Sequence, residues 1–149
     1  MIIKRDQYLK KLISRQWNGQ IKVITGIRRC GKSYLLRNLF KEYLLSQGVK
    51  NDQIIHLELD LVSNIRYRNP LELSQYIHDC IDGKTEKFYL FIDEIQMPEP
   101  VKNPYLPEGK KITFYDTLND FRAIPNLDVY VTGSNSKMLS TDILTEFRG

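Results

Sequence analysis

Gly26-Ile27-Arg28-Arg29-Cys30-Gly31-Lys32-Ser33 is the stretch of sequence that decides how this chain folds. It matches the pattern G-x-x-x-x-G-K-[ST], which binds phosphate when a strand precedes it and a helix follows it. The β-branched run at residues 21–25 precedes it, and residues 34–45 carry apolar side chains at helical spacing. The flanking sequence therefore predicts a strand, a phosphate-binding loop and a helix.

The two glycines of this loop account for its chemistry. Gly26 and Gly31 allow backbone conformations and close approaches that a Cβ would block, so successive N–H groups can surround a phosphate. The helix that begins near Lys32 adds its unpaired N–H groups and the positive end of its dipole. We expect Lys32 to reach the β- and γ-phosphates and Ser33 to coordinate Mg²⁺. The predicted nucleotide-binding residues are Gly26, Ile27, Arg28, Arg29, Cys30, Gly31, Lys32, Ser33 and Tyr34.

A second informative stretch covers residues 87–94 and ends in two acids, Asp93 and Glu94. Five consecutive apolar residues before the acids are typical of a buried parallel strand whose carboxylates emerge at its carboxyl end. In phosphate-loop enzymes an aspartate at such a strand end holds Mg²⁺, directly or through water. An adjacent glutamate can orient or deprotonate the attacking water. We therefore predict Asp93 as a metal ligand and Glu94 as the catalytic carboxylate.

The rest of the chain alternates between predicted strands and helices. Strands are expected at residues 54–60 and 127–132, and helices at residues 4–16, 71–81, 112–123 and 140–147. His56 is interpreted as an ordinary strand residue, because no partner at metal-ligand spacing accompanies it. The proline-rich residues 97–111 are predicted to form a loop, either a lid or partner contact or a mobile insertion. This alternation predicts one α/β domain with a mainly parallel sheet between helices.

The net charge of +4 is unevenly distributed along the 149 residues. Residues 1–50 carry 12 Lys and Arg against 2 Asp and Glu, whereas residues 51–149 carry 10 against 16. A basic segment of this kind can indicate nucleic-acid binding. Part of it is the phosphate site itself, however, and the remainder matches the solvated face of one helix. DNA contact therefore stays open as an expectation.

Nothing in the sequence points to a membrane or to an oxidising compartment. There is no apolar run near 18 residues, and residues 1–5 lack signal-peptide architecture. The two cysteines, Cys30 and Cys80, show no metal-ligand spacing and are interpreted as reduced thiols. A cytoplasmic location without membrane contact is expected.

Three segments together resemble a family of prokaryotic AAA-type ATPases. These are residues 25–33, residues 91–96 with the sequence Phe-Ile-Asp-Glu-Ile-Gln, and residues 131–136 with the sequence Val-Thr-Gly-Ser-Asn-Ser. The resemblance implies a phosphate-loop NTPase fold, with ATP and Mg²⁺ held by Lys32, Ser33 and Asp93 and with Glu94 as catalytic carboxylate. It also implies that Asn135, or Ser134 beside it, senses the γ-phosphate. Arg148 lies near the position of an arginine finger that acts on a neighbouring subunit.

The same resemblance implies segments that follow residue 149. Members of the family continue into another strand, a helical lid and a C-terminal domain of nuclease-like or DNA-binding character, so this chain is expected to be the N-terminal ATPase part of a longer protein. DNA contact would then come mainly from the C-terminal part. A missing fifth strand would leave residues 21–25 as an exposed apolar edge, which self-association could cover.

The predicted function is ATP binding and Mg²⁺-dependent hydrolysis that drives a conformational switch in a larger ATPase. One alternative is a small-molecule or nucleotide kinase, which shares the phosphate loop but rarely has this acidic pair. A second alternative is a module that binds nucleotide without productive turnover. The absence of an N-K-x-D run argues against a GTPase.

Overall fold

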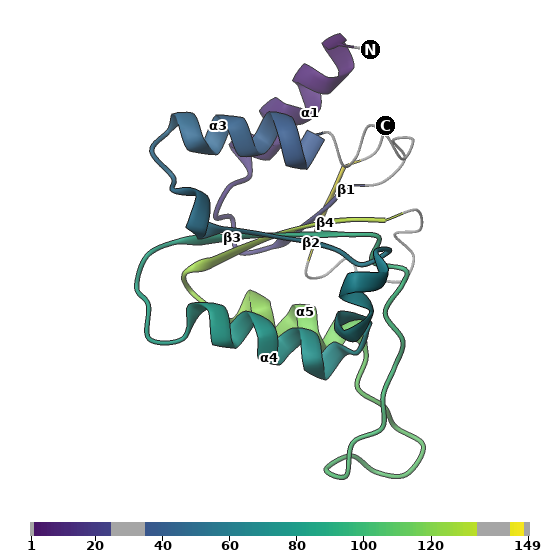
Figure 1. Ribbon diagram of the computed structural model, residues 1–149. Coiled ribbons are helices and arrows are strands. Elements are labelled where there is room, and N and C mark those ends of the chain that lie inside the picture. The colour runs from purple at the N-terminus through teal and green to yellow at the C-terminus, as the bar shows by residue number, and fades with distance from the viewer. Residues whose placement is uncertain (1, 25–34, 134–143, 148–149) are drawn as a thin grey trace.

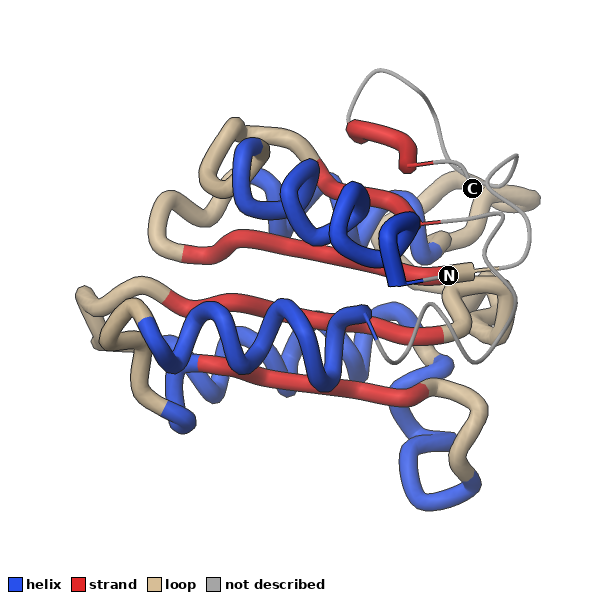
Figure 2. The backbone as a smooth tube through the Cα atoms, turned by 90° about the horizontal axis from the view of Figure 1, so that it is seen from above, coloured by secondary structure: helices blue, strands red, loops and turns tan. Residues whose placement is uncertain are grey.

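The structure is a computed structural model that describes residues 2–24, 35–133 and 144–147. Within these ranges the strands form one five-stranded sheet in which every neighbouring pair is parallel. Its order is β2 (Ile54–Glu58), β3 (Phe88–Asp93), β4 (Leu127–Thr132), β1 (Ile21–Ile24) and β5 (Leu144–Phe147). Helices lie on both faces (Figure 1 and Figure 2). The predicted α/β fold with a parallel sheet between helices is confirmed.

The two faces of the sheet carry different helices. One face is covered by α1 (Ile2–Ser14), the π-helix η1 (Leu35–Phe40) and α3 (Lys41–Ser46). The other face is covered by α4 (Pro70–Ile81) and α5 (Phe114–Arg122). Two short 3₁₀ segments, η2 (Asn51–Gln53) and η3 (Val62–Arg68), flank β2. The helix expected after the phosphate loop is present, but its first described residues have π rather than α geometry.

Side chains of the central strands point alternately to the two faces of the sheet and form a separate core on each face. In β3, Leu90 and Ile92 pack in the cluster beneath α4 and α5. Tyr89 and Phe91 pack in the cluster that also contains residues of α1 and η1. Successive side chains of a strand point to opposite faces, so a strand covered on both faces is a continuous apolar run. All six residues of β3 and of β4 are buried, which explains the uninterrupted apolar sequence before Asp93.

Side-chain caps determine where two of the helices begin. The Asn69 side chain accepts hydrogen bonds from the Leu71 and Glu72 N–H groups at 2.9 and 3.3 Å, and α4 starts at the next residue, Pro70. Thr113 and Asp116 form a reciprocal capping box at the start of α5. Such caps satisfy N–H groups that have no partner within the helix. The cap places the start of α5 two residues later than the predicted residue 112.

The C-terminal strand corrects two predictions. Residues 144–147 were expected to continue a helix from residue 140, but they form β5 and pair with β1, from Ile21 opposite Leu144 to Ile24 opposite Phe147. The expectation that the strand flanking residues 21–25 lies beyond the end of the chain is therefore wrong. β1 is paired on both sides and fully buried, so the predicted exposed apolar edge is also wrong. The argument for self-association through that edge is thereby removed.

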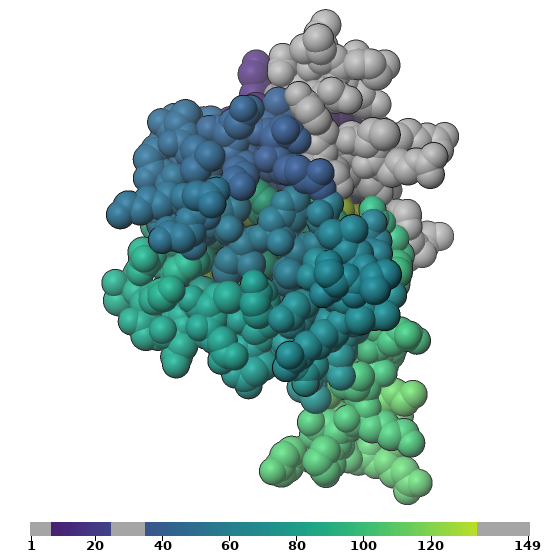
Figure 3. Space-filling model, viewed as in Figure 1, coloured from purple at the N-terminus to yellow at the C-terminus, as the bar shows by residue number. Residues whose placement is uncertain are grey.

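Residues 97–113 form an arm between β3 and α5, and it projects below the body in Figure 1 and Figure 3. Val101 and Ile112 form an antiparallel bridge, with nitrogen-to-oxygen distances of 2.9 and 2.7 Å. The Glu99 N–H donates to the Arg68 carbonyl at 3.1 Å, which ties the base of the arm to η3. Tyr105 is 92% exposed. The predicted loop is therefore present, and its role as a lid or partner contact stays a prediction.

Candidate functional site

Three predicted site segments meet at the carboxyl edge of the sheet. β1 ends at Ile24, directly before the predicted phosphate loop, and Ile24 lies opposite Thr132 at the end of β4. β3 ends at Asp93 beside β4, with Ile92 opposite Val131. Since parallel strands place their carboxyl ends at one edge, the chain enters residues 25–34 at the same edge as Asp93 and Glu94, with β4 between β1 and β3. The strands that lead into the two predicted motifs therefore end at one edge of the sheet.

Most of the residues assigned to nucleotide binding lie outside the described residues. This applies to the whole loop, namely Gly26, Ile27, Arg28, Arg29, Cys30, Gly31, Lys32, Ser33 and Tyr34. It applies equally to Ser134, Asn135 and Arg148. Their roles remain predictions, and the geometry that follows concerns Asp93, Glu94 and their described neighbours.

Asp93 is a buried carboxylate held by side chains from both neighbouring strands. It is 1% exposed. The Thr132 hydroxyl donates to Oδ1 at 2.9 Å, and His56 Nε2 lies 2.7 Å from Oδ2. A carboxylate only accepts hydrogen bonds, so the His56 ring nitrogen facing it carries the proton. Burial of a carboxylate is expensive unless it is hydrogen-bonded. β2 and β4 therefore hold Asp93 in a defined position at the edge where the predicted phosphate loop begins.

Glu94 leaves the strand through a left-handed turn. Its φ is +64°, a conformation that a residue with a Cβ adopts at a cost of order 1 kcal/mol. Its N–H donates to the Thr132 hydroxyl oxygen at 3.3 Å, and the next N–H, of Ile95, donates to the Thr132 carbonyl at 2.9 Å. Its Oε1 accepts from Gln96 Nε2 at 2.6 Å. The turn therefore separates the backbone of Glu94 from β3 and fastens it to β4.

Gly133 closes this edge without room for a side chain. Its N–H donates to the Ile24 carbonyl at 3.3 Å, joining the end of β1 to the end of β4. A Cβ at Gly133 would lie 2.7 Å from Ile95 Cγ1, closer than side chains approach one another. The glycine in the sequence Val-Thr-Gly-Ser-Asn-Ser therefore lets the turn after β3 pack directly on the backbone that follows β4.

Sequence reasoning overlooked three residues of this arrangement: His56, Thr132 and Gln96. His56 was interpreted as an ordinary strand residue, yet it contacts Asp93. One signal was available, since His56 lies two residues before the carboxyl end of its strand, the end at which such sites form. Nothing in the local pattern revealed Thr132 as a partner of both acids, because the contact joins strands 39 residues apart.

The predicted Mg²⁺ site is described only in part. In residues 2–24, 35–133 and 144–147, no group of three or more His, Cys, Asp and Glu side chains could hold a metal ion. The predicted Mg²⁺ site would combine Asp93 with Ser33, which lies outside those ranges. In the same ranges, no helix is both long and apolar enough to cross a bilayer.

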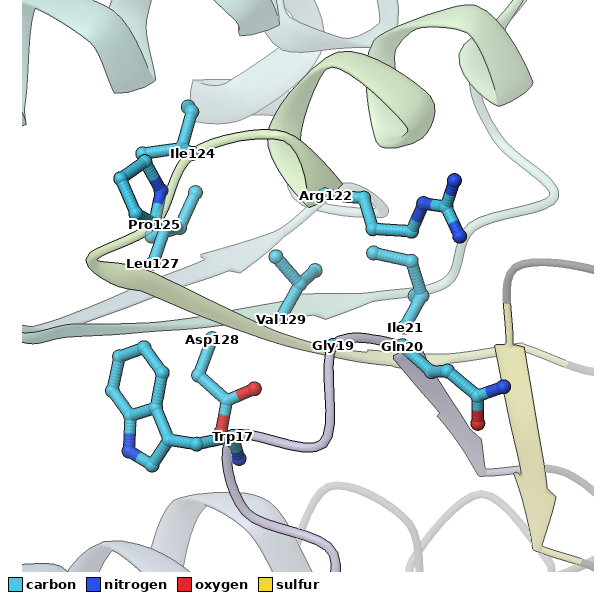
Figure 4. Close-up of a pocket in the computed structure, with 10 residues that line it drawn as sticks. All are labelled: Trp17, Gly19, Gln20, Ile21, Arg122, Ile124, Pro125, Leu127, Asp128 and Val129. Carbon is cyan, nitrogen blue, oxygen red and sulfur yellow. The ribbon is translucent and has the colours of Figure 1, made fainter.

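A separate hollow lies at the opposite, amino end of β1 and β4 (Figure 4). It measures about 140 Å³, and Trp17, Arg122 and Asp128 are among its lining residues. The Asp128 carboxylate is not free: it forms a buried ion pair with Lys22 and accepts the Trp17 N–H at 3.0 Å. Burial lowers the pKa of Lys22, and the Asp128 carboxylate acts in the opposite direction. This network holds the start of β1 against β4 and is distant from Asp93.

Comparisons with known proteins agree with this fold. Residues 18–149 match the family described as AAA domain. An uncharacterised protein of Haemophilus influenzae is 33% identical over 148 residues, covering 99% of this chain and 34% of that protein. An uncharacterised protein of Methanocaldococcus jannaschii is 30% identical over 152 residues, covering 99% of this chain and 27% of that protein. The chain thus spans about a third or less of the length of these two curated relatives.

Two solved structures share the fold at low sequence identity. A chain of Drosophila ORC bound to DNA aligns with a TM-score of 0.62 at 13% identity, covering 97% of this chain and 89% of that chain. A chain of Drosophila ORC bound to AT-rich DNA and Cdc6 aligns with a TM-score of 0.55 at 11% identity, covering 97% and 53%. These similarities concern the fold alone. The family match covers nearly the whole sequence, and the chain therefore belongs to the AAA domain family.

Proposed function

We propose that this domain binds ATP with Mg²⁺ and hydrolyses it, and that hydrolysis drives a conformational change in a longer protein. The observation that carries the proposal is the meeting of three strand ends at one edge. The entry to the phosphate loop, the acids Asp93 and Glu94, and Thr132 all lie there. Membership of the AAA domain family supports nucleotide binding at this edge.

The residues at this edge suit a hydrated Mg²⁺. Oxygen ligands are the ones this ion prefers, and it usually keeps several waters. Asp93, held in place by Thr132 and His56, offers oxygen ligands of this kind when its carboxylate is ionised. Asp93 and the hydroxyl of Ser33 would hold the ion, and Lys32 with the loop N–H groups would hold the phosphates. The bound Mg·ATP supplies the phosphoanhydride bond and the cation that offsets its charge.

Glu94 has the proposed catalytic role. Its carboxylate would orient the attacking water and accept a proton from it, while Thr132 keeps the backbone of Glu94 and the carboxylate of Asp93 in register. Asn135, or Ser134 beside it, would sense the γ-phosphate. Arg148 would act as an arginine finger on a neighbouring subunit, which is the remaining reason to propose self-association.

The larger setting follows from the length of the relatives. Because the chain spans about a third or less of both, we propose that it is the ATPase part of a longer protein. DNA contact, which the printed titles record for the ORC structures, would involve mainly other parts of that protein. A cytoplasmic location and the absence of membrane contact belong to the same proposal.

Calorimetric titration with ATP·Mg²⁺ and with GTP, combined with a phosphate-release assay, tests the proposal. Lys32→Ala should abolish nucleotide binding, because the loop loses the charge that reaches the β- and γ-phosphates. The matched control is Lys50→Ala, at an exposed lysine outside the site. Glu94→Gln should retain binding and suppress release, whereas Glu99→Gln, at an exposed glutamate of the arm, should change neither.

The same assay separates the alternatives. Phosphate transfer that depends on an added acceptor would indicate a kinase. Binding without release would indicate a nucleotide-binding module. Equal turnover in Glu94→Gln and in the unmodified chain would remove Glu94 from the mechanism.

A further inference from the structure

We propose that Gln96 is a positioning residue that holds the Glu94 carboxylate in one orientation. The inference rests on the proposed function, in which Glu94 is the catalytic carboxylate. It assigns the residue that aims this carboxylate and predicts which step a substitution at Gln96 would slow. Contact geometry, backbone anchoring and one buried unpaired oxygen each support it.

The contact itself has a single possible polarity. Gln96 Nε2 lies 2.6 Å from Glu94 Oε1, a short distance typical of a hydrogen bond to a charged acceptor. An ionised carboxylate only accepts, so the amide must turn its NH₂ group toward Glu94. Both side chains are half-buried, which limits competition from water. Gln96 thus holds one oxygen of the carboxylate.

The backbone that carries both side chains is fastened at several points. The N–H groups of Glu94 and Ile95 donate to the hydroxyl and carbonyl oxygens of Thr132. The Met97 N–H donates to the Glu94 carbonyl at 3.1 Å and closes the turn around Gln96. Ile95 is 1% exposed and sits against Gly133. Because its backbone is already fixed, the Gln96 side chain loses little further conformational freedom when it orients the Glu94 carboxylate.

The side-chain oxygen of Gln96, Oε1, lies in an environment that is unfavourable for stability. Once the NH₂ group faces Glu94, Oε1 points to the opposite side, 3.3 Å from where a Cβ on Gly133 would lie. That oxygen is buried and has no hydrogen-bond partner among the described residues. Leaving a buried acceptor unsatisfied is destabilising. A methionine of similar length would fill the same space without this penalty, so packing alone does not explain a glutamine here.

The arrangement suits a carboxylate that must present one particular oxygen. In the described part of the chain, Gln96 is the residue that donates to the Glu94 side chain, and it donates to Oε1 alone. Oε2 is then the oxygen presented to a water molecule. A carboxylate free to rotate would present Oε2 to the water only part of the time. Loss of Gln96 should therefore slow the chemical step and leave nucleotide binding unchanged.

Gln96→Met separates positioning from a structural role. It removes the donor to Glu94 and the unpaired oxygen together, while keeping the side-chain length. We expect kcat for phosphate release to fall about tenfold, with the Kd for ATP·Mg²⁺ and the thermal unfolding midpoint close to those of the unmodified chain. Gln75→Met is the matched control, because it breaks an amide–carboxylate bond of 2.8 Å to Asp79 on the exposed surface of α4. It should leave kcat unchanged.

A measurement without nucleotide keeps the test independent of turnover. The side-chain amide resonances of Gln96, assigned in ¹⁵N spectra by their loss in Gln96→Met, should shift toward the values of a free amide in Glu94→Ala. An unchanged resonance would overturn the inference even if the chain hydrolyses ATP. If the chain releases no phosphate but the resonance shifts, the proposed hydrolysis fails and the orientation of Glu94 by Gln96 stands. Unchanged or increased kcat in Gln96→Met, or a joint fall of kcat, affinity and unfolding midpoint, would overturn it.

Discussion

Thr132→Val removes a hydroxyl that contacts both acids of the site. The Thr132 hydroxyl donates to Asp93 Oδ1 at 2.9 Å, and its oxygen accepts the Glu94 N–H at 3.3 Å. Thr132 is fully buried, and Asp93 is 1% exposed. Valine has nearly the same shape, so the substitution deletes two hydrogen bonds without opening a cavity.

The expected destabilisation follows from the charge of the acceptor. A hydrogen bond to a buried charged group contributes about 1.5–3 kcal/mol, and the longer bond to the Glu94 N–H about 0.5–1.5 kcal/mol. We therefore expect Thr132→Val to lower the free energy of unfolding by about 2–4 kcal/mol. The free energy of unfolding of a domain is roughly 5–15 kcal/mol, so the variant should still fold. For a chain of this size the unfolding midpoint should fall by roughly 5–15 °C.

Equilibrium urea unfolding without nucleotide provides the assay. The matched control is Thr117→Val, because Thr117 is also buried and its hydroxyl donates at 2.9 Å to a neutral acceptor, the Pro70 carbonyl. In that control the free energy of unfolding should fall by only about 1 kcal/mol. If Thr132→Val is no more destabilising than Thr117→Val, the Asp93 carboxylate does not depend on this hydroxyl and the reasoning is refuted.

Three further predictions concern the same sheet. Gly133→Ala should lower the free energy of unfolding by about 1–3 kcal/mol in urea titrations, because the new methyl group overpacks the turn after β3; an unchanged value would contradict the packing described. His56→Phe should cost about 1–3 kcal/mol, because the buried Asp93 loses a donor. The control is His78→Phe, which breaks an exposed contact to the Asp120 carboxylate and should change the free energy of unfolding by no more than about 0.5 kcal/mol. If the two substitutions were equally destabilising, burial of the carboxylate would not explain the contribution of His56. Burial raises the pKa of Tyr130 above its ordinary value of 10.0. As pH rises, Tyr130 therefore loses its phenolic proton at a lower pH in the unfolded chain than in the folded chain. The free energy of unfolding should fall as pH rises beyond about 10, and it should fall less in Tyr130→Phe.

Local patterns were enough to predict most strands and helices. The apolar run before Asp93 became β3 and residues 127–132 became β4, because both strands are buried on both faces and need apolar side chains throughout. Pro70 and the apolar spacing after it correctly predicted α4. These features depend on neighbours within a few positions of the same segment, which is why one sequence could reveal them.

Residues 144–147 show where local pattern fails. Leu144-Thr145-Glu146-Phe147 is compatible with either a helix or a strand, and its four residues are too short for periodicity to decide. Its conformation is set by β1, whose buried backbone would otherwise leave one edge without hydrogen-bond partners. The preference of the segment is thus overridden by a pairing that involves residues more than a hundred positions earlier.

The sequence by itself determined the fold and predicted the kind of site that it holds. The glycine and lysine spacing of residues 26–33, the apolar run before Asp93 and Glu94, and the alternation of strands and helices are all local properties of the chain. Only the tertiary structure decided which side chains control the two acids. His56 and Thr132 meet Asp93 across 37 and 39 residues of sequence, and their contacts depend on the order and register of the strands. That order arises from the way helix-containing connections bring distant strands together, a geometry that no local pattern encodes.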